Sequence, residues 1–265
     1  MEHTEIRVVT SAKGGVGKST VCTGLGAALA ARGKRVLLID CDTANRSLDL
    51  MLGLEDEVLF GMTDVLCGRC EASRAVLAVP GYEDNLFLLP AGGGDTAVCG
   101  RDAPKAIVDA FTDGNDTSPH FDYIFIDTPG GVREVLLSAA AVSGEALIVS
   151  SAQATAVRSA QNTADLILSD TGLGNARLVI NQFMGGECFF SHTRVRGRRR
   201  KQTAATDTLF SVVDTVALPL LGVVPFDAAV WEVPNAGQLP PSSPVTRAFS
   251  NMAARLCHRN VPLFS

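Results

Sequence analysis

The chain has 265 residues, of which 46% are hydrophobic and 19% are charged, a balance that allows a large buried core and excludes an intrinsically disordered chain. Its 23 basic and 28 acidic residues give a net charge of −5, which excludes a generally basic nucleic-acid coat protein. No apolar run approaches the roughly 18 residues of a membrane helix, and the first residues lack the pattern of a signal peptide. Because the seven cysteines are irregularly spaced, we expect reduced thiols in a cytoplasmic protein with no integral membrane segment.

Short apolar runs recur along the chain and alternate with helix-like segments. The runs are continuous rather than alternating, which is typical of strands buried on both faces of a sheet. The expected strands are residues 6–10, 35–40, 86–89, 123–127, 146–150, 178–180 and 221–224. Apolar stripes predict a helix over residues 20–32, capped by Gly33, and a last helix over residues 244–258.

This succession of strand, helix and strand predicts an α/β fold with a mainly parallel, twisted sheet and helices on both faces. We expect a single domain over residues 1–265, since no linker or internal repeat divides the chain. Two stretches interrupt the pattern. Residues 186–206 are predicted to be a polar insertion, and the turn-rich residues 234–244 are predicted to be neither helix nor central strand.

A glycine-rich loop, SAKGGVGKST over residues 11–20, lies between the first expected strand and the first expected helix. Its glycines let the backbone approach an anion closely, and successive N–H groups at the start of a helix suit a phosphate. Lys18 can neutralise the phosphate oxygens, and the Ser19 hydroxyl can ligand Mg²⁺. The residues expected to bind the nucleotide are Lys13, Gly14, Gly15, Val16, Gly17, Lys18, Ser19 and Thr20.

The loop resembles that of the deviant Walker A ATPases of the MinD/ParA family, since the pattern Lys-Gly-Gly-x-Gly-Lys-[Ser/Thr] is matched from Lys13 to Ser19. The strict Walker A spacing requires glycine at position 12, where this chain has Ala12. The resemblance implies a P-loop NTPase fold, ATP or ADP and Mg²⁺ as ligands, and slow ATP hydrolysis. It also implies an ATP-dependent homodimer in which Lys13 reaches the partner's phosphates, a protein activator, and a role as a spatial switch in septum site determination or another positioning process.

Two carboxylates, Asp40 and Asp42, follow the second expected strand at the edge where open α/β sheets bind ligands. One can hold the water shell of Mg²⁺ while the other orients an attacking water. The segment is similar to the switch of the MinD branch, which implies that Asp42 positions the water; the matching residues are Asp40, Asp42, Arg46, Leu48, Asp49 and Leu50. Ala44, Asn45 and Ser47 depart from the glycine, leucine and asparagine of that pattern.

A third segment ends in Asp127, which follows four apolar residues and fits a Walker B carboxylate aimed at the Mg²⁺ shell. The Pro-Gly-Gly at 129–131 allows a turn near the γ-phosphate. For the adenine base, the resemblance implies contacts from Asn181, Pro225 and Asp227 at two later strand ends. An asparagine side chain offers both a donor and an acceptor, which matches an adenine edge.

Three further segments bear on which partner or surface the protein binds. Where the MinD branch carries Asn-Pro-Glu, this chain has Ser-Ala-Gln, and Gln153 keeps hydrogen-bonding capacity but loses the charge. Six basic residues lie between Arg194 and Lys201, a local charge that suits DNA, an anionic membrane or an acidic protein, or a solvated loop. Because no aromatic residue interleaves them, sequence-specific base reading is not expected. The last residues, 259–265, are too short and proline-broken for a membrane-surface helix.

A lone Cys-x-x-Cys is formed by Cys67 and Cys70. One pair cannot complete a four-ligand zinc site, although two subunits of a dimer could. A structural or incidental pair is the favoured interpretation. Two alternatives to a MinD-like function stay open: a ParA-like DNA-segregation ATPase that uses the basic run, and a metallocentre-maturation ATPase that uses Cys67 and Cys70.

Overall fold

The computed structural model describes the backbone of residues 4–82, 84–93, 100, 102–112, 120–185, 198–228 and 243–263, and the same side chains except those of 198–205. Within these ranges one eight-stranded sheet has the order β3-β4-β2-β5-β1-β6-β7-β8. All neighbouring strands are parallel except β3 and β4, which are antiparallel. The strands are β1 (Glu5–Thr10), β2 (Val36–Asp40), β3 (Leu77–Ala78), β4 (Leu86–Leu89), β5 (Tyr123–Asp127), β6 (Glu145–Ser150), β7 (Ala176–Phe183) and β8 (Leu220–Pro225).

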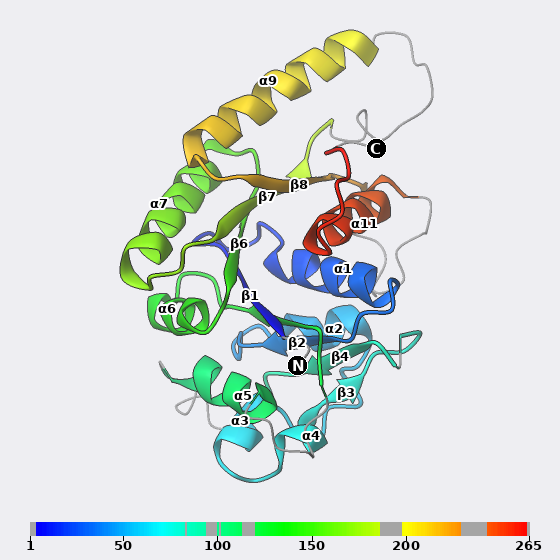
Figure 1. The fold of residues 1–265 in the computed structure, drawn as a ribbon, viewed down its shortest axis with the longest axis vertical. Coiled ribbons are helices and arrows are strands. Elements are labelled where there is room, and N and C mark those ends of the chain that lie inside the picture. Colours follow the sequence, from blue (N-terminus) through cyan, green and yellow to red (C-terminus); the bar gives the residue numbers. More distant parts are fainter. Residues whose placement is uncertain are drawn as a thin grey trace.

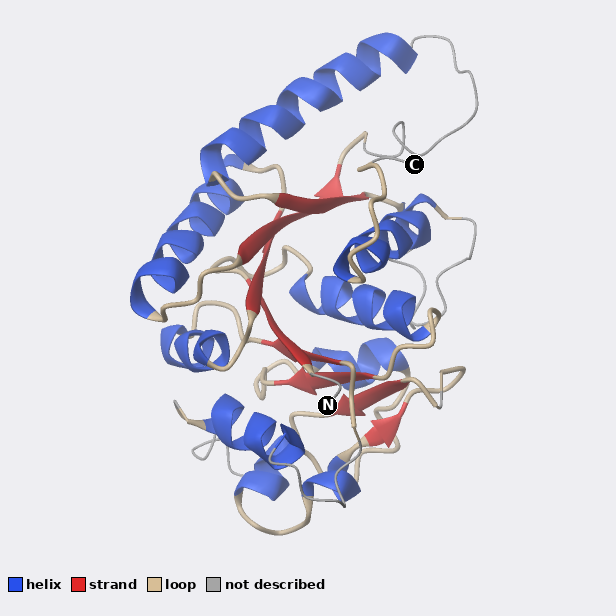
Figure 2. Ribbon diagram, in the orientation of Figure 1, coloured by secondary structure: helices blue, strands red, loops and turns tan. Residues whose placement is uncertain are grey.

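Helices cover both faces of the sheet (Figure 1, Figure 2). The helices of the described residues are α1 (Lys18–Ala30), α2 (Ser47–Leu52), α3 (Met62–Leu66), α4 (Ala72–Ala75), α5 (Ala103–Thr112), α6 (Arg133–Ala141), α7 (Ala154–Asp170), α9 (Arg198–Val216) and α11 (Pro244–Leu256). Side chains of α1, α2 and α11 form one hydrophobic cluster with the sheet, and those of α3 to α7 and α9 form a second. The sheet therefore lies between two helical layers.

The continuous apolar runs in the sequence follow from this layering. In β2, Leu37 and Ile39 belong to the cluster on one face, while Val36 and Leu38 belong to the cluster on the other. Successive side chains of a strand point to opposite faces, so a strand covered on both sides needs apolar residues at every position. The expected strands and the parallel α/β fold are confirmed, with each boundary within three residues of the prediction.

The helix boundaries differ modestly from the prediction. α1 begins two residues earlier than expected, at Lys18, and ends at Ala30, so that Gly33 lies beyond its C-cap in a left-handed conformation (φ 76°). α11 begins as predicted at Pro244, where the Ser243 hydroxyl caps it by accepting from the Thr246 N–H at 3.0 Å. The apolar stripe predicted for this helix is buried.

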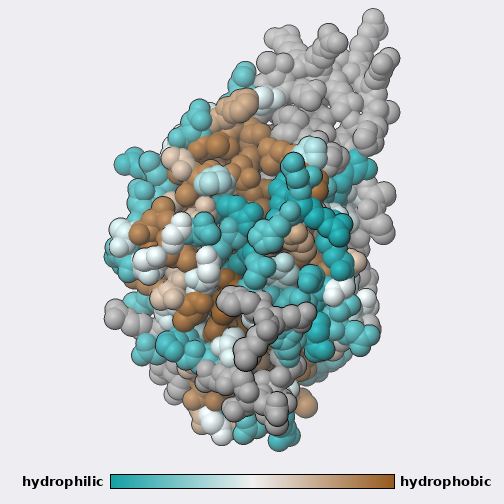
Figure 3. All heavy atoms as spheres, viewed as in Figure 1, coloured by the Kyte–Doolittle hydropathy of each residue, from teal (hydrophilic) through white to brown (hydrophobic). Residues whose placement is uncertain are grey.

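The last part of the predicted polar insertion is helical, because α9 begins at Arg198 and continues through residue 206. Residues 186–197 and 229–242 lie outside the described residues, and so does most of the turn-rich segment. None of the described helices combines the length and apolar character needed to cross a bilayer. Figure 3 shows the viewed face as a mosaic in which hydrophobic patches, the largest in its upper part, lie among hydrophilic side chains.

Candidate nucleotide-binding site

The glycine-rich loop connects the carboxyl end of β1, in the middle of the sheet, to the start of α1. Gly15 and Gly17 have φ values of 77° and 87°, in the left-handed region that favours glycine. A Cβ on Gly17 would also lie 2.1 Å from the Nδ2 atom of Asn181. Glycine is thus required at position 17 for two independent reasons, and the first N–H groups of α1 are available to an anion.

Lys18 opens α1 and is only 9% exposed. In the part of the chain that the structure describes, its ammonium makes no hydrogen bond and no ion pair. A Cβ on Gly130, in the turn after β5, would lie 3.5 Å from the Lys18 Nζ atom, which places this ammonium between the loop and the turn. The charge of Lys18 lowers the pKa of Asp127, but no carboxylate of the described residues forms an ion pair with it, and a phosphate anion would supply such a partner.

Two buried aspartates end neighbouring strands of the sheet, since Asp40 of β2 is in register with Asp127 of β5. Burial, together with the charge of Asp127, raises the pKa of Asp40 to about 8, although the N–H groups of Asp42 and Leu48 donate to it. Burial raises the pKa of Asp127 to about 7. The Ser19 hydroxyl donates to the Oδ2 atom of Asp127 at 2.6 Å.

This set of oxygens fits Mg²⁺. The Oδ1 atom of Asp127 is buried without a hydrogen-bond partner among the described residues, and two adjacent buried carboxylates repel one another. A hard divalent cation relieves both costs and prefers oxygen ligands, with several waters retained. Ser19 would contact the ion directly, and Asp40 and Asp127 would hold its water shell. No group of three or more His, Cys, Asp or Glu side chains in the described residues could hold a metal alone.

The segment after β2 brings Asp42 close to the same edge. Asp42 as a whole is 7% exposed, and each of its carboxylate oxygens accepts a hydrogen bond from Asn45. Arg46 adopts a left-handed conformation (φ 45°) at the start of α2 and pairs with Asp49 at 3.1 Å. The Ser47 hydroxyl lies 2.8 Å from that of Ser19, a contact that the sequence pattern did not predict.

Lys13 lies on the exposed side of the loop. Its Nζ atom donates to the Oε1 atom of Gln153 at 2.9 Å and to the Oγ1 atom of Thr155 at 3.0 Å. Gln153 precedes α7 and Thr155 lies in its first turn, so the contact is made within one chain. Thr155 carries no signal in the sequence, because its contact with Lys13 spans 142 positions.

The residues predicted to contact adenine are Asn181 in β7, and Pro225 and Asp227 at or just beyond the end of β8. Asn181, in β7, is buried and donates from Nδ2 to the carbonyl of Val16 at 2.9 Å. The neighbouring Gln182 has a φ of 55° and donates to the carbonyl of Gly15 at 3.3 Å, a loop contact missed in the sequence. Pro225 ends β8 and is buried, and Asp227 follows two residues later, half-buried. The structure thus joins Asn181 to the loop by a hydrogen bond, and the adenine contacts of Pro225 and Asp227 stay predictions.

Comparison with known proteins agrees with a phosphate-binding site at this edge of the sheet. A family model described as "ParA: NUBPL iron-transfer P-loop NTPase" matches residues 2–257. This chain belongs to the ParA/MinD family of P-loop NTPases. The septum site-determining protein MinD of Bacillus subtilis (strain 168) is 33% identical over 264 residues, which cover 98% of this chain and 91% of that protein. MinD of Synechocystis sp. is 34% identical over 265 residues, covering 97% and 91%.

Solved structures agree with this ParA/MinD assignment. The MinC:MinD cell division protein complex of Aquifex aeolicus matches with a TM-score of 0.77 at 30% identity, covering 98% of each chain. MinD from Pyrococcus horikoshii, complexed with Mg-ADP, matches with a TM-score of 0.75 at 25% identity, covering 96% of each chain. The predicted fold class is confirmed, and so is the assignment as a P-loop ATPase that uses Mg²⁺ and ATP or ADP.

Two sequence features stand apart from the ParA/MinD nucleotide site. Cys67 and Cys70 carry free thiols at the end of α3, and burial, with the charge of Asp64, raises the pKa of Cys70. A raised pKa reduces the thiolate that redox chemistry and metal binding require. Within the basic run, residues 194–197 lie outside the described residues, and Arg198 to Lys201 lie in α9, where side chains are not described.

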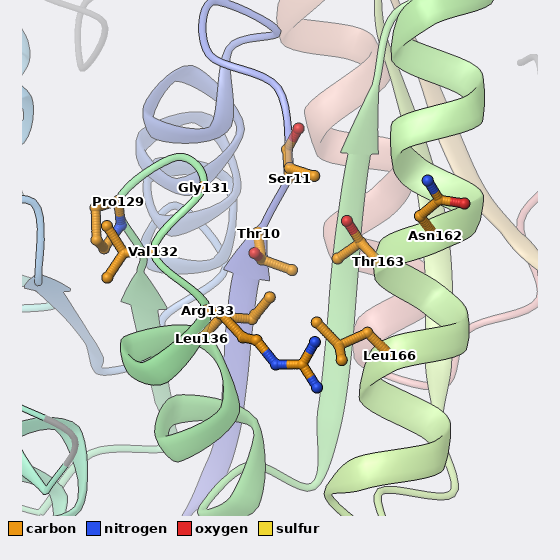
Figure 4. A pocket seen from close by; sticks show the side chains of 11 residues that line it. Thr10, Ser11, Pro129, Gly131, Val132, Arg133, Leu136, Asn162, Thr163 and Leu166 are labelled. Carbon is orange, nitrogen blue, oxygen red and sulfur yellow. The ribbon is translucent and has the colours of Figure 1, made fainter.

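A small pocket adjoins the start of the loop (Figure 4). It has a volume of about 140 Å³ and is lined by Thr10, Ser11, Ala12, Pro129, Gly131, Val132, Arg133, Leu136, Asn162, Thr163 and Leu166. Arg133 and Leu136 of α6 face Thr163 and Leu166 of α7 across it. Because this lining is mostly apolar, we assign the pocket no part in the phosphate chemistry.

Proposed function

We propose that the chain is a MinD-like ATPase whose ATP-bound form is a homodimer that acts as a spatial switch in septum placement during cell division. The proposal is supported by one convergence above all. An unpaired buried lysine, a serine hydroxyl and two buried aspartates meet at one sheet edge, in a chain about one third identical to MinD proteins over nearly its whole length.

Hydrolysis follows from this edge by positioning and electrostatics. The loop N–H groups and Lys18 bind the phosphate oxygens. Ser19, Asp40 and Asp127 would hold Mg²⁺, which would supply positive charge next to the phosphate oxygens. Asp42 accepts a hydrogen bond from the attacking water and orients it toward the γ-phosphorus. The water oxygen forms a bond to this phosphorus as the bond between the phosphorus and the bridging oxygen breaks; ADP and phosphate leave, and the proton of the water passes to the phosphate or to solvent.

Dimerisation gives Lys13 its role. To reach the phosphates of a second copy, its ammonium must leave Gln153 and Thr155, with which it makes only exposed hydrogen bonds to neutral groups. Such bonds contribute about 0.5–1.5 kcal/mol each, so their loss is readily offset by contact with a phosphate. ATP would then favour the dimer because it binds that state better.

A protein partner is part of this proposal, since one similar structure is a MinC:MinD complex. We place the ATPase in the cytoplasm, or at the membrane surface through a partner, and leave DNA and anionic membrane as ligands to be tested for Arg194 to Lys201. A ParA-like role has less support, because the plasmid partition proteins are only 19–20% identical and share the fold alone. A metallocentre role would need Cys67 and Cys70 from two subunits.

The test is the mass of the protein in solution with each nucleotide. We expect a monomer with MgADP and a dimer with MgATP, and we expect Asp42→Ala to bind ATP, retain it unhydrolysed and accumulate as a dimer. Size-exclusion chromatography with light scattering measures this directly. A chain that stays monomeric with MgATP, in both the wild type and the variant, would contradict the switch.

A further inference from the structure

Asn45 holds the carboxylate of Asp42 from three positions further along the same loop. The backbone N–H of Asn45 donates to the Oδ1 atom of Asp42 at 3.0 Å, and the Nδ2 amide of Asn45 donates to the Oδ2 atom at 2.8 Å. The first bond belongs to a local turn that many residues could make. The second bond depends on the side chain, and it reaches the oxygen that the turn leaves free.

The backbone around Asp42 is held separately. Its N–H donates to the Oδ1 atom of Asp40 at 2.8 Å, and its carbonyl accepts from the N–H of Arg46 at 2.9 Å. Asp40 also accepts from the N–H of Leu48, so both ends of the segment from 42 to 48 are hydrogen-bonded to the same buried carboxylate. With the main chain fixed in this way, the Asn45 amide decides how the Asp42 carboxylate is turned.

Although both oxygens of the Asp42 carboxylate accept a hydrogen bond from Asn45, the carboxylate can still accept another from water. Each carboxylate oxygen has two lone-pair positions, so an oxygen with one donor can accept a second hydrogen bond from water. Only 7% of Asp42 is exposed, which leaves few directions from which that water can come. Moreover, the switch pattern of the MinD branch has leucine at position 45, and a leucine side chain cannot donate. This feature therefore belongs to the present chain rather than to the pattern it shares.

We infer that Asn45 is a positioning residue for ATP hydrolysis, whose amide fixes the orientation in which Asp42 accepts a hydrogen bond from the attacking water. The inference rests on the role proposed for Asp42. Loss of a partner that orients a metal ligand typically costs about 10- to 100-fold in activity, and we expect a loss of the same order for the partner that orients Asp42. A misplaced carboxylate affects the chemical step, whereas the loop, Lys18 and Ser19 continue to bind the nucleotide.

The test replaces Asn45 with leucine, which has a similar size and keeps the backbone N–H but removes the amide donor. We expect Asn45→Leu to lower kcat by about 10- to 100-fold, with KM for ATP and the Kd for ADP within about twofold of the wild type. Thr43→Val is the matched control, because it alters the same loop at a side chain that makes no hydrogen bond in the described residues. We expect its kcat to be unchanged.

A double variant separates this inference from the proposed function. Asp42→Asn alone should abolish turnover, and adding Asn45→Leu to it should cost nothing more, because the amide acts only through Asp42. Wild-type turnover in Asn45→Leu, with Asp42→Asn inactive, would overturn the role of Asn45 and leave that of Asp42 standing. Wild-type turnover in Asp42→Asn would overturn both. A parallel loss of ADP binding in Asn45→Leu would mark a structural role and also overturn the inference.

Discussion

Two groups of buried charges, at opposite ends of the strands, are satisfied in different ways. At the amino ends, Glu145 accepts from Arg7 at 2.8 Å and from Arg177 at 2.6 Å. Burial opposes ionisation of Glu145, but these guanidinium groups outweigh it and lower its pKa. At the carboxyl ends, burial raises the pKa of Asp40 to about 8 and of Asp127 to about 7.

The difference shows how structural and functional charges can be separated in this fold. A group that serves only the fold is neutralised by partners within the chain, because an unpaired buried charge costs several kcal/mol. At the nucleotide edge two adjacent carboxylates repel one another, and Lys18 makes no ion pair among the described residues, although its charge lowers the pKa of Asp127. An orphaned atom does not by itself separate the two ends, since Asp127 Oδ1 and Arg7 Nη1 are both buried without a hydrogen-bond partner in the described residues. Such a site is completed by its ligand, and perturbed pKa values mark it.

The largest expected effect is at the ligand-completed end. Lys18→Ala removes the ammonium that neutralises the phosphates, and we expect loss of ATP binding and of hydrolysis by about 100-fold or more. Isothermal titration calorimetry and phosphate release measure the two quantities. Lys105→Ala, which removes an exposed lysine of α5, is the control and should change neither. ATP affinity and turnover at wild-type levels in Lys18→Ala would refute the site.

The next largest effect concerns Glu145, at the amino ends of the strands. Glu145→Gln removes the carboxylate that Arg7 and Arg177 share, which leaves Arg177 without that counter-charge and Arg7 with Glu5 alone, so we expect a loss of about 3 kcal/mol in the free energy of unfolding. Nucleotide affinity should stay within about twofold, because the change lies at the far ends of the strands. Urea unfolding, with Glu134→Gln as an exposed control, tests this. Wild-type stability in Glu145→Gln, or a large loss of its ATP affinity, would contradict a purely structural role of Glu145.

The smallest effect concerns pH. Because the pKa values of Asp40 and Asp127 are raised from an ordinary 3.8, the folded chain binds more protons than the unfolded chain between about pH 4 and pH 8. Without nucleotide and Mg²⁺, this contribution to stability is present at low pH and is lost as the pH rises through 7 to 8. Asp127→Asn removes one of the two charges, so it should exceed the wild type by about 1–3 kcal/mol at pH 8.

Chemical unfolding at pH 5.5 and pH 8 measures this difference, with Asp56→Asn as an exposed control that should follow the wild type. Glu145 acts in the opposite sense, since its lowered pKa supports stability above its ordinary value of 4.5 and the support is lost on acidification. The window from pH 5.5 to 8 therefore reports on the nucleotide end. If Asp127→Asn is no more stable to unfolding than the wild type at pH 8, repulsion between Asp40 and Asp127 does not destabilise the folded chain.

The sequence predicted the parts of the molecule that repeat one physical rule. Every strand of the parallel core is covered on both faces, so each appeared as a continuous apolar run, and the loop before α1 carried its function in consecutive residues. The two-residue strand β3 was not predicted, because Leu77–Ala78 is too short to show a period. No helix was predicted for α9, whose first residues are basic rather than apolar.

Within the site, the sequence analysis named candidate residues but not the atoms that each one contacts. The contacts of Lys13 with Gln153 and Thr155 join positions 140 and 142 apart, and no periodicity carries such information. Asn45 and Ser47 were visible only as departures from a family pattern. Their hydrogen bonds to Asp42 and Ser19 depend on how the loop folds over the sheet edge, which local propensity does not determine.

The position of β1 has a consequence for the newborn chain. β1 lies between β5 and β6, and its first residue, Glu5, pairs with Tyr123. The strand that carries the phosphate loop is therefore made before both of its neighbours, and the first of them follows only after more than a hundred further residues. At about 5–20 residues per second this interval lasts roughly 6–24 s. During synthesis the loop is exposed before it can hold a nucleotide, and ATP can stabilise this chain only after its central strands have met.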